Sequence, residues 1–244
     1  MRRLFTLAIV SAGLVYGQAQ MTRTVRLANI GSPQGIQEAL TVLRTVANIR
    51  SVVSGDNANS SITFTGTPTE VALGGWIIAS IDVGGPMAPQ QYVVPGAKDD
   101  VVKVAYLTNT NMQQGIQELL TQLRMVLSLA KVFDVTRPQA VVFRGTSDQI
   151  AATTWLIAQL DRPFDPNAAT ATYPIGADQV KVFYLHNISG PKPTQELLNA
   201  IRMQAKVQHV FVSHAPRAIA MLGTTDQIAE ADALVAMHDV PTTR

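Results

Sequence analysis

The sequence contains no cysteine, and only 6% of its 244 residues are aromatic. Without thiols the chain can form no disulfide framework and has no thiol chemistry, so its fold depends on packing alone. Charged residues are also sparse, at 15%, against 47% hydrophobic residues. This balance excludes a disordered chain and predicts a folded one.

The sequence patterns of common catalytic sites are missing as well. The chain has no G-x-S-x-G nucleophile elbow, no phosphate-binding P-loop and no H-E-x-x-H metal motif. The spacing Gly31-x-x-x-Gly35 matches neither a KH nucleotide clamp nor a dinucleotide-binding fingerprint. We therefore expect no enzyme, no catalytic residues and no cofactor.

The small excess of positive charge comes from the N-terminus. Of 19 basic residues, Arg2 and Arg3 precede a mostly apolar stretch that ends near the small residues Gly17 and Ala19. This pattern predicts a signal peptide over residues 1–19, with an uncleaved membrane anchor as the alternative. Without those two arginines, 17 basic residues balance 17 acidic ones. A neutral chain lacks the field that attracts nucleic acids, so we expect no nucleic-acid partner.

One plan occurs three times along the rest of the chain. Its markers keep spacings of 78 to 80 residues, which indicates internal repeats of about 60 residues joined by linkers. A unit that small buries only about 60% of its unfolded surface, so contacts with neighbouring repeats or other chains are expected to matter. A Gln-Glu pair begins at Gln37, Gln117 and Gln195, and a Gly-Thr pair begins at Gly66, Gly145 and Gly223.

Each repeat has the pattern strand, helix, strand, strand, helix. In the middle repeat, the first helix is predicted over 114–130 from its apolar periodicity. The second helix starts at a capping box in every repeat, for example Thr67 with Glu70. The predicted fold class is α+β, with three tandem two-layer βαββα domains, each a three-stranded sheet with two helices on one face.

The predicted boundaries follow from these markers. The linkers are rich in Pro, Gly and Ala and share a Tyr…Pro…Gly-Ala pattern, so they are expected to be semi-ordered, with a short extended segment. The predicted parts are a signal peptide at 1–19, repeats at 24–82, 101–163 and 179–241, and linkers at 83–100 and 164–178.

The repeated signature resembles the N-domain of bacterial secretins. Its pieces in the middle repeat are Tyr106 to Asn109, Gln117 to Leu120, Val141 to Thr146, and Ile157 to Pro163. The resemblance implies a KH-like βαββα fold, a periplasmic location, and domains that pack side by side into rings in type II and type III secretion and type IV pilus systems. It ends before the β-rich C-terminal domain of a secretin, so it implies ring building and not pore formation.

The partners implied by this resemblance are further copies of the chain, in a homo-oligomer or ring, and components of a secretin, secretion or pilus complex. Association with the outer membrane would then occur through those partners. The alternative is a periplasmic adaptor that captures an extended peptide at a sheet edge or a linker.

An arginine recurs beside the apolar stripe of the first helix in every repeat, at Arg44, Arg124 and Arg202. One interpretation is an ion pair to a neighbouring domain or subunit, with the aspartate that ends each repeat as its partner. The other is a solvated side chain whose aliphatic stem covers the edge of the stripe.

A tryptophan occupies one position of the second helix in two repeats, at Trp76 and Trp155, where the third repeat has Ala233. It can anchor an interface or pack in a core. Together with the three arginines, these two tryptophans are the candidate interface residues.

All four histidines lie in the third repeat. A zinc site would need several imidazoles to converge on one ion. His209 and His214 lie five residues apart along a predicted strand, which predicts opposite faces. We therefore expect no metal site.

Overall fold

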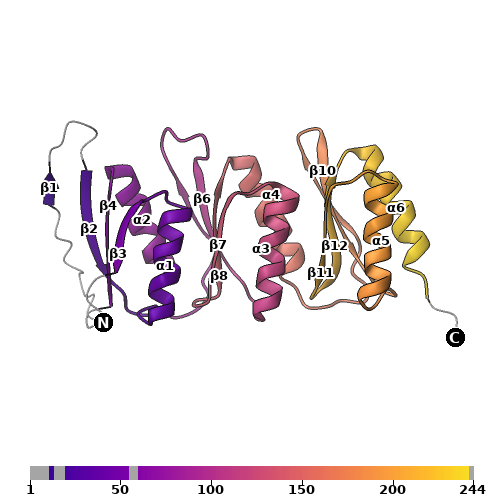
Figure 1. Ribbon diagram of the computed structural model, residues 1–244, viewed down its shortest axis with the longest axis horizontal. Coiled ribbons are helices and arrows are strands. Elements are labelled where there is room, and N and C mark those ends of the chain that lie inside the picture. The colour runs from indigo at the N-terminus through magenta and orange to yellow at the C-terminus, as the bar shows by residue number, and fades with distance from the viewer. Residues whose placement is uncertain (1–10, 14–19, 55–59, 242–244) are drawn as a thin grey trace. The chain divides into compact units, whose positions relative to one another are not determined.

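The computed structural model describes residues 11–13, 20–54 and 60–241 (Figure 1). Apart from Ser11–Gly13, the predicted signal peptide at 1–19 lies outside the described residues, and so does most of the predicted turn at 55–60. No helix in the described part of the chain is both long and apolar enough to cross a membrane.

The order β-α-β-β-α occurs three times, which confirms the predicted α+β repeats. The first repeat contains β2 (Gln20–Arg26), α1 (Pro33–Thr45), β3 (Ser51–Ser54), β4 (Ser61–Gly66) and α2 (Pro68–Ile81). The second contains β6 (Val101–Tyr106), α3 (Gln113–Leu127), β7 (Lys131–Val135), β8 (Ala140–Gly145) and α4 (Ser147–Leu160). The third contains β10 (Asp178–Tyr184), α5 (Pro191–Met203), β11 (His209–His214), β12 (Arg217–Gly223) and α6 (Thr225–His238).

Each sheet has four strands, so the prediction of three-stranded sheets is wrong. The extra strands are β1 (Ser11–Gly13), β5 (Gln90–Val93) and β9 (Ala171–Ile175). The orders are β1-β2-β4-β3 in the first sheet, β5-β6-β8-β7 in the second and β9-β10-β12-β11 in the third, with every pair antiparallel.

Two of these extra strands come from the predicted linkers. Gly96 and Gly176 adopt positive φ angles of 73° and 61°, which lets the chain turn back so that β5 pairs with β6 and β9 with β10. The short extended segment expected in each linker is a strand of four residues in β5 and five in β9, paired into the sheet as its fourth strand.

The chain divides into two compact units. One comprises residues up to Leu107 together with Lys131–Ile150, and the other comprises Thr108–Ala130 together with the residues from Ala151 onward. The strands of the second repeat therefore belong to the first unit, and its helices, apart from the first four residues of α4, belong to the second.

In the first unit, α1 and α2 cover one face of the first sheet. Ile62 and Phe64 of β4 are fully buried on that inner face, beneath helix residues such as Leu43 and Ile78. Thr63 and Thr65 alternate with them on the opposite, outer face, as the two-residue period of a strand requires.

The same hydrophobic core continues from these helices onto the second sheet. Strand β7 packs against α1, and β6 and β8 of the same sheet contribute Val102, Val104 and Val142, all fully buried. A repeat of this size buries too little surface by itself, and the first repeat gains burial by covering the next sheet.

In the second unit, the third sheet lies between helices. Its inner face carries Phe183, Ile219 and Met221, which pack with α5 and α6. Helix α3 packs against β11 and β12. Two residues of the opposite, outer face, Val182 and Ala220, are fully buried.

Candidate assembly interface

A helix-on-sheet contact occurs once in each unit. In the first joint, α1 and α2 cover the outer face of the second sheet, and in the second joint, α3 and α4 contact the outer face of the third sheet. Val42 and Val46 of α1, and Gln122 and Val126 of α3, occupy matching helix positions and are fully buried. The first helix of a repeat therefore has two buried stripes, one for its own core and one for a joint.

A glutamate at one helix position anchors both joints. In the first joint, the Glu38 carboxylate accepts hydrogen bonds from Thr136 N at 2.9 Å and Thr136 Oγ1 at 2.6 Å. In the second, the Glu118 carboxylate accepts from His214 N at 3.0 Å and pairs with His214 Nδ1 at 2.8 Å. The helix thus holds the end of the neighbouring strand through two bonds, one of them to the backbone.

A tyrosine closes the other side of each joint. Tyr106 Oη donates to Ser80 O of α2 at 2.6 Å, and Tyr184 Oη lies 3.1 Å from Gln159 O of α4. Burial raises the pKa of the Tyr106 phenol, so this side chain remains a neutral donor. Both carbonyls lie in the last turn of a helix, where they have no partner within the helix.

Both predicted tryptophans lie at these joints. Trp76 of α2 meets Tyr92 of β5, and Trp155 of α4 meets Tyr173 of β9, each with ring centroids 5.4 Å apart. Each ring is half-buried, and each contacts the strand that the sequence placed in a linker. Contact with another chain remains a prediction for both residues.

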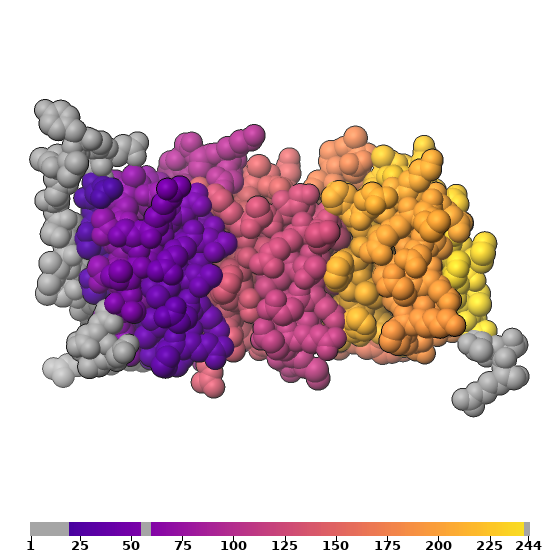
Figure 2. Space-filling model, in the orientation of Figure 1, coloured from indigo at the N-terminus to yellow at the C-terminus, as the bar shows by residue number. Residues whose placement is uncertain are grey.

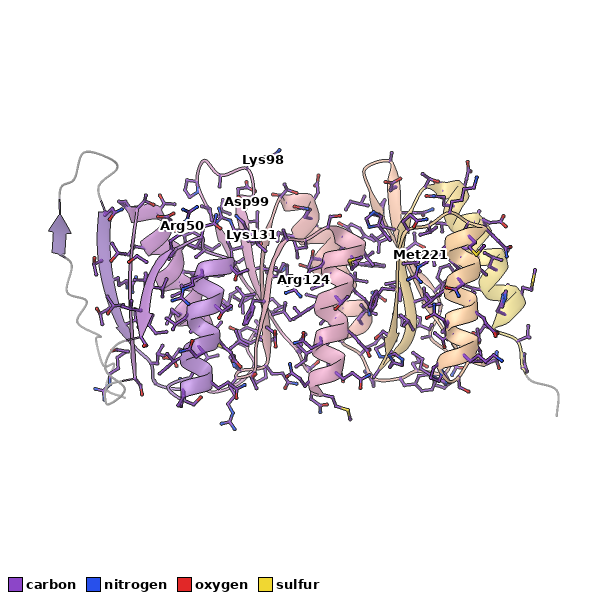
Figure 3. The ribbon with its side chains drawn as sticks, viewed as in Figure 1. Arg50, Lys98, Asp99, Arg124, Lys131 and Met221 are labelled. Carbon is purple, nitrogen blue, oxygen red and sulfur yellow. The ribbon has the colours of Figure 1, made fainter. Side chains whose placement is uncertain are left out.

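Two of the predicted arginines, Arg44 and Arg202, bond within their own repeats. Arg44 Nη2 donates to Val52 O at 2.8 Å, and Arg202 Nη2 donates to Val210 O at 3.3 Å. Arg124 stands at the same position of α3 (Figure 3). No ion pair in the described part of the chain joins Arg44 or Arg202 to the aspartates proposed as their partners, and their role in an intermolecular interface stays a prediction.

Those aspartates instead hold a backbone loop in every repeat. Asp82 accepts hydrogen bonds from three successive amides, Ala28 N, Asn29 N and Ile30 N, at 2.6–3.0 Å, while Asn29 Nδ2 donates to Asp82 O. Asp161 likewise accepts from the backbone amides of Thr108–Thr110, and Asp239 accepts from those of His186–Ile188. The Leu-x-Asn and terminal Asp of the repeat signature are therefore two halves of one clamp, which the spacing alone did not reveal.

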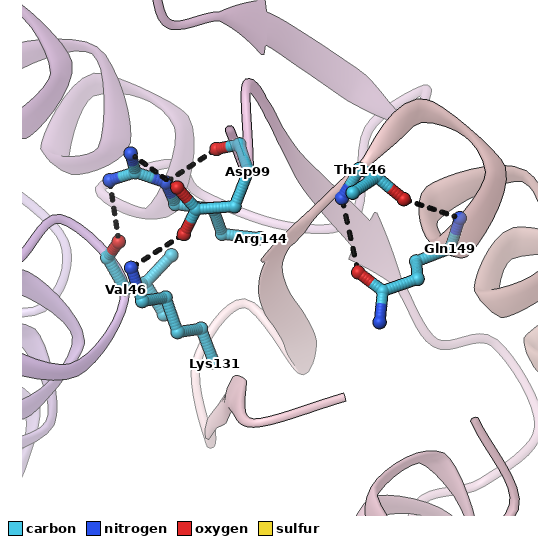
Figure 4. Close-up of polar contacts among 6 residues, drawn as sticks. All are labelled: Val46, Asp99, Lys131, Arg144, Thr146 and Gln149. Carbon is cyan, nitrogen blue, oxygen red and sulfur yellow. Dashed lines mark hydrogen bonds and ion pairs between the residues drawn. The ribbon is translucent and has the colours of Figure 1, made fainter. Parts of the chain in front are cut away.

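A charged cluster supports the first joint and was missed in the sequence (Figure 4). Arg144, only 7% exposed, donates to Val46 O at the end of α1 at 3.3 Å and to Asp99 Oδ1 at 3.2 Å. Lys131 Nζ donates to Asp99 Oδ2 at 2.5 Å, and Figure 3 shows Lys98 extending away from this pair. Burial alone would raise the pKa of Asp99, but the Lys131 hydrogen bond and the charges of Arg144 and Lys131 together lower it.

A pocket of about 510 Å³ lies beside the second joint. Its walls include the exposed side chains Met112 and Phe164, with the Arg217 guanidinium 4.9 Å from the Phe164 ring centroid. Two of its polar groups, Glu118 and His214, are paired with each other. The lining suits an apolar group and offers no pair of free carboxylates for acid–base chemistry.

Two histidines bond to α3 across the second joint, and a third bonds within its own helix. His209 Nδ1 lies 2.6 Å from Met125 O, and His238 Nδ1 lies 2.8 Å from Leu234 O of its own helix. His209 and His214 both contact α3, so the prediction of opposite faces is wrong, because His214 is the last residue of β11, where the chain turns. Across the described ranges, no three His, Asp or Glu side chains are placed to hold a metal ion.

The chain matches no protein-family profile and no curated protein sequence. It is similar to solved secretin structures. XcpQN012 is 19% identical, with 91% of this chain and 100% of that one covered, at a TM-score of 0.29. ExeD of Aeromonas hydrophila is 18% identical, with 92% and 42% covered, at 0.22. The N-terminal domain of the secretin XcpQ from Pseudomonas aeruginosa is 14% identical, with 63% and 70% covered, at 0.25.

One of these structures is described as the N-terminal domain of a secretin. The chain spans less than half the length of ExeD. At these identities and TM-scores, the matches support no conclusion about activity or partners.

Proposed function

We propose that this protein is a non-enzymatic, periplasmic assembly protein. Its secretin N-like repeats mediate oligomerisation or docking to the secretin complex of a secretion or type IV pilus system. The observation that carries this proposal is the recurrence of one helix-on-sheet joint in both units, with glutamates in matching positions, Glu38 and Glu118. A domain that presents a helix face on one side and a sheet face on the other can add neighbours of its own kind.

The proposal extends to the predicted parts of the chain. The signal peptide at 1–19 would direct export, and the repeats at 24–82, 101–163 and 179–241 would act as successive building blocks. Trp76 and Trp155 would anchor contacts between blocks, as their pairing with Tyr92 and Tyr173 supports. Arg44, Arg124 and Arg202 would line exposed helix surfaces available to partners.

The test is to express the full chain in a Gram-negative host, isolate it from the periplasm, and measure its mass by mass photometry alongside an affinity pull-down. We expect species larger than the monomer, a secretin periplasmic region in the pull-down, or both. Monomer alone together with no envelope partner would refute the proposal.

The second candidate function is a periplasmic adaptor that binds an extended peptide. The observation favouring it is the pocket beside the second joint, where Met112 and Phe164 are exposed at 75% and 50%. A pull-down dominated by one peptide or pilin-like ligand, and lost with Phe164→Ser, would support this function over the first.

A further inference from the structure

Each repeat has a first helix and an outer sheet face. The first helix takes part in a joint in two of the three repeats, and the outer sheet face does so in two of the three. Helix α1 covers the second sheet and α3 contacts the third. Among the described residues, the two unused halves are the outer face of the first sheet and the joint stripe of α5. A further joint can form only if the helix half of one copy contacts the sheet half of another copy, or if other proteins bind these two faces.

The helix half, here called the C-terminal helix face, consists of Glu196, Ala200, Met203 and Gln204 of α5 with Met237 of α6. Glu196 holds the position of Glu38 and Glu118, and Ala200 that of Val42 and Gln122. Helix α5 forms part of the surface seen in Figure 2 (orange).

Exposure separates this face from its counterparts. Met237 is 69% exposed, whereas Ser80, which holds its position in α2, is 7% exposed. Met203 is 80% exposed, and its counterpart Met125 is 53% exposed within the second joint. A helix end adapted only to water would carry polar residues at these positions, as terminal capping repeats do. Exposed, flexible methionines such as Met203 at the end of α5 and Met237 at the end of α6 are instead typical of binding surfaces.

The sheet half, here called the N-terminal sheet face, consists of Thr22, Thr24, Thr63 and Thr65 with Val53 and Arg26. Its hydroxyls already bond in pairs, Thr22 Oγ1 to Thr65 Oγ1 at 2.7 Å and Thr24 Oγ1 to Thr63 Oγ1 at 2.8 Å. Because each hydroxyl keeps its hydrogen-bond partner when the surface is desolvated, a helix can cover this face at little cost in free energy.

Two further residues of the N-terminal sheet face hold positions whose counterparts lie in the two joints. Val53, 58% exposed, holds the position of Phe133 in β7 and Phe211 in β11. The exposed Arg26 holds the position of Tyr106 and Tyr184, whose hydroxyls bond a carbonyl in the last turn of a helix.

On α6 the matching carbonyl belongs to Met237. A guanidinium there would gain both a hydrogen bond and a favourable interaction with the negative end of the helix dipole. The unused sheet face thus carries a cation at the position that would meet the negative end of the α6 dipole. That charge match favours a second copy of this chain over an unrelated partner.

We infer that the C-terminal helix face of one copy docks on the N-terminal sheet face of a second copy, forming a third joint head to tail. The inference rests on the proposed function, since it assigns the surfaces through which the protein self-assembles. Such a heterologous contact can continue from copy to copy, and it closes into a ring only when the rotation per copy permits. Ala233 replaces the tryptophan of the other joints, so we expect weaker association than within the chain.

The test measures self-association of the mature chain by sedimentation velocity over a range of concentrations. Met203→Glu with Met237→Glu alters the helix face, and Val53→Glu alters the sheet face independently. Met87→Glu is the matched control, since Met87 is 51% exposed and belongs to neither face. Thermal unfolding followed by circular dichroism verifies that each variant folds.

We expect each face variant to weaken association at least about tenfold and the control to leave it unchanged. A one-to-one mixture of the two face variants should form dimers and nothing larger, because each variant keeps one intact half. Dimers in the mixture distinguish a head-to-tail contact from a symmetric one.

Two outcomes overturn the inference while the proposed function stands. Either oligomers persist in both face variants, or the wild-type chain is monomeric at every concentration yet still binds a secretin's periplasmic region. A monomeric chain that also binds no envelope partner refutes both.

Discussion

The two joints share one geometry but differ in chemistry. In the first, Val42 fills the centre of the helix stripe and Arg144 links the end of α1 to Asp99. In the second, Gln122 lies fully buried at the Val42 position, with no hydrogen-bond partner for its amide N or O among the described residues, and Leu222 replaces Arg144. The positions of the helix and the strand therefore define the joint, whereas the side chains between them determine how stable it is.

The comparison predicts a more stable contact in the first unit. An unpaired buried amide costs about 1–3 kcal/mol, whereas a fully satisfied charged cluster avoids that cost. Each unit contains one tryptophan, Trp76 in the first and Trp155 in the second, so fluorescence can report the two joints separately. Trp155→Phe leaves a reporter of the first joint, and Trp76→Phe leaves a reporter of the second.

The largest expected effect comes from Asp99→Asn, which leaves Arg144 buried without its counter-charge. Because Asp99 is itself one-third exposed, we expect a loss of about 2–3 kcal/mol in the free energy of unfolding of the first unit. Urea denaturation followed by Trp76 fluorescence measures it. Asp165→Asn is the matched control, since its exposed pair with Arg162 spans 3.6 Å and should contribute under about 0.5 kcal/mol.

The same variant has a defined pH dependence. The pKa of Asp99 is lowered from 3.8, so its contribution to stability is fully present above that value and is lost as the pH falls through the lower, folded-state pKa. The difference between the wild-type chain and Asp99→Asn should therefore be constant near neutrality and shrink below about pH 3.8. A difference that stays constant into strong acid would contradict the assignment of the ion pair.

A reciprocal exchange at the stripe centre tests the source of the difference between the joints. Val42→Gln should destabilise the first joint by about 2 kcal/mol, because it buries an amide among apolar groups. Gln122→Val should stabilise the second by about 1 kcal/mol, because it removes one. Urea midpoints read from the tryptophan of each unit measure both, and a loss of stability in Gln122→Val would show that the amide has a partner after all.

The smallest expected effect belongs to the strand-end partner of the glutamate. His214→Thr copies the first joint, where Thr136 bonds Glu38 through its amide and hydroxyl. His214 is 62% exposed, so the change should cost at most about 0.5 kcal/mol near neutral pH. Trp155 fluorescence in urea measures it, and Glu118→Gln should cost more because it also weakens the bond from the His214 backbone N–H.

Much of the fold was predictable from local signals. The capping boxes at Thr67 and Thr224 form as predicted, and at Thr146 the hydroxyl accepts from Gln149 N at 3.3 Å while Gln149 Oε1 accepts from Thr146 N at 3.2 Å (Figure 4). The helix predicted over 114–130 is α3, which ends three residues early because Ser128 adopts a left-handed φ of 53°. These features involve residues close in sequence.

The candidate site was less predictable. Trp76 and Trp155 were candidate interface residues, with core packing as the alternative, and their tyrosine partners lay in the predicted linkers. Glu38 and Glu118 belong to the Gln-Glu pairs that mark the repeat, and the sequence assigned them no further role. The Arg144–Asp99 pair spans 45 residues and has no counterpart in the other repeats, so the repeat pattern could not reveal it.

The sequence by itself determined the repeat, the order of its elements and the starts of its second helices, because spacing, periodicity and capping act over a few residues. Only the tertiary structure decided that the first helix of a repeat has a second buried stripe and that the linkers supply a fourth strand. A helix of 3.6 residues per turn can bury two of its sides, and which polar side is buried depends on the neighbour that covers it.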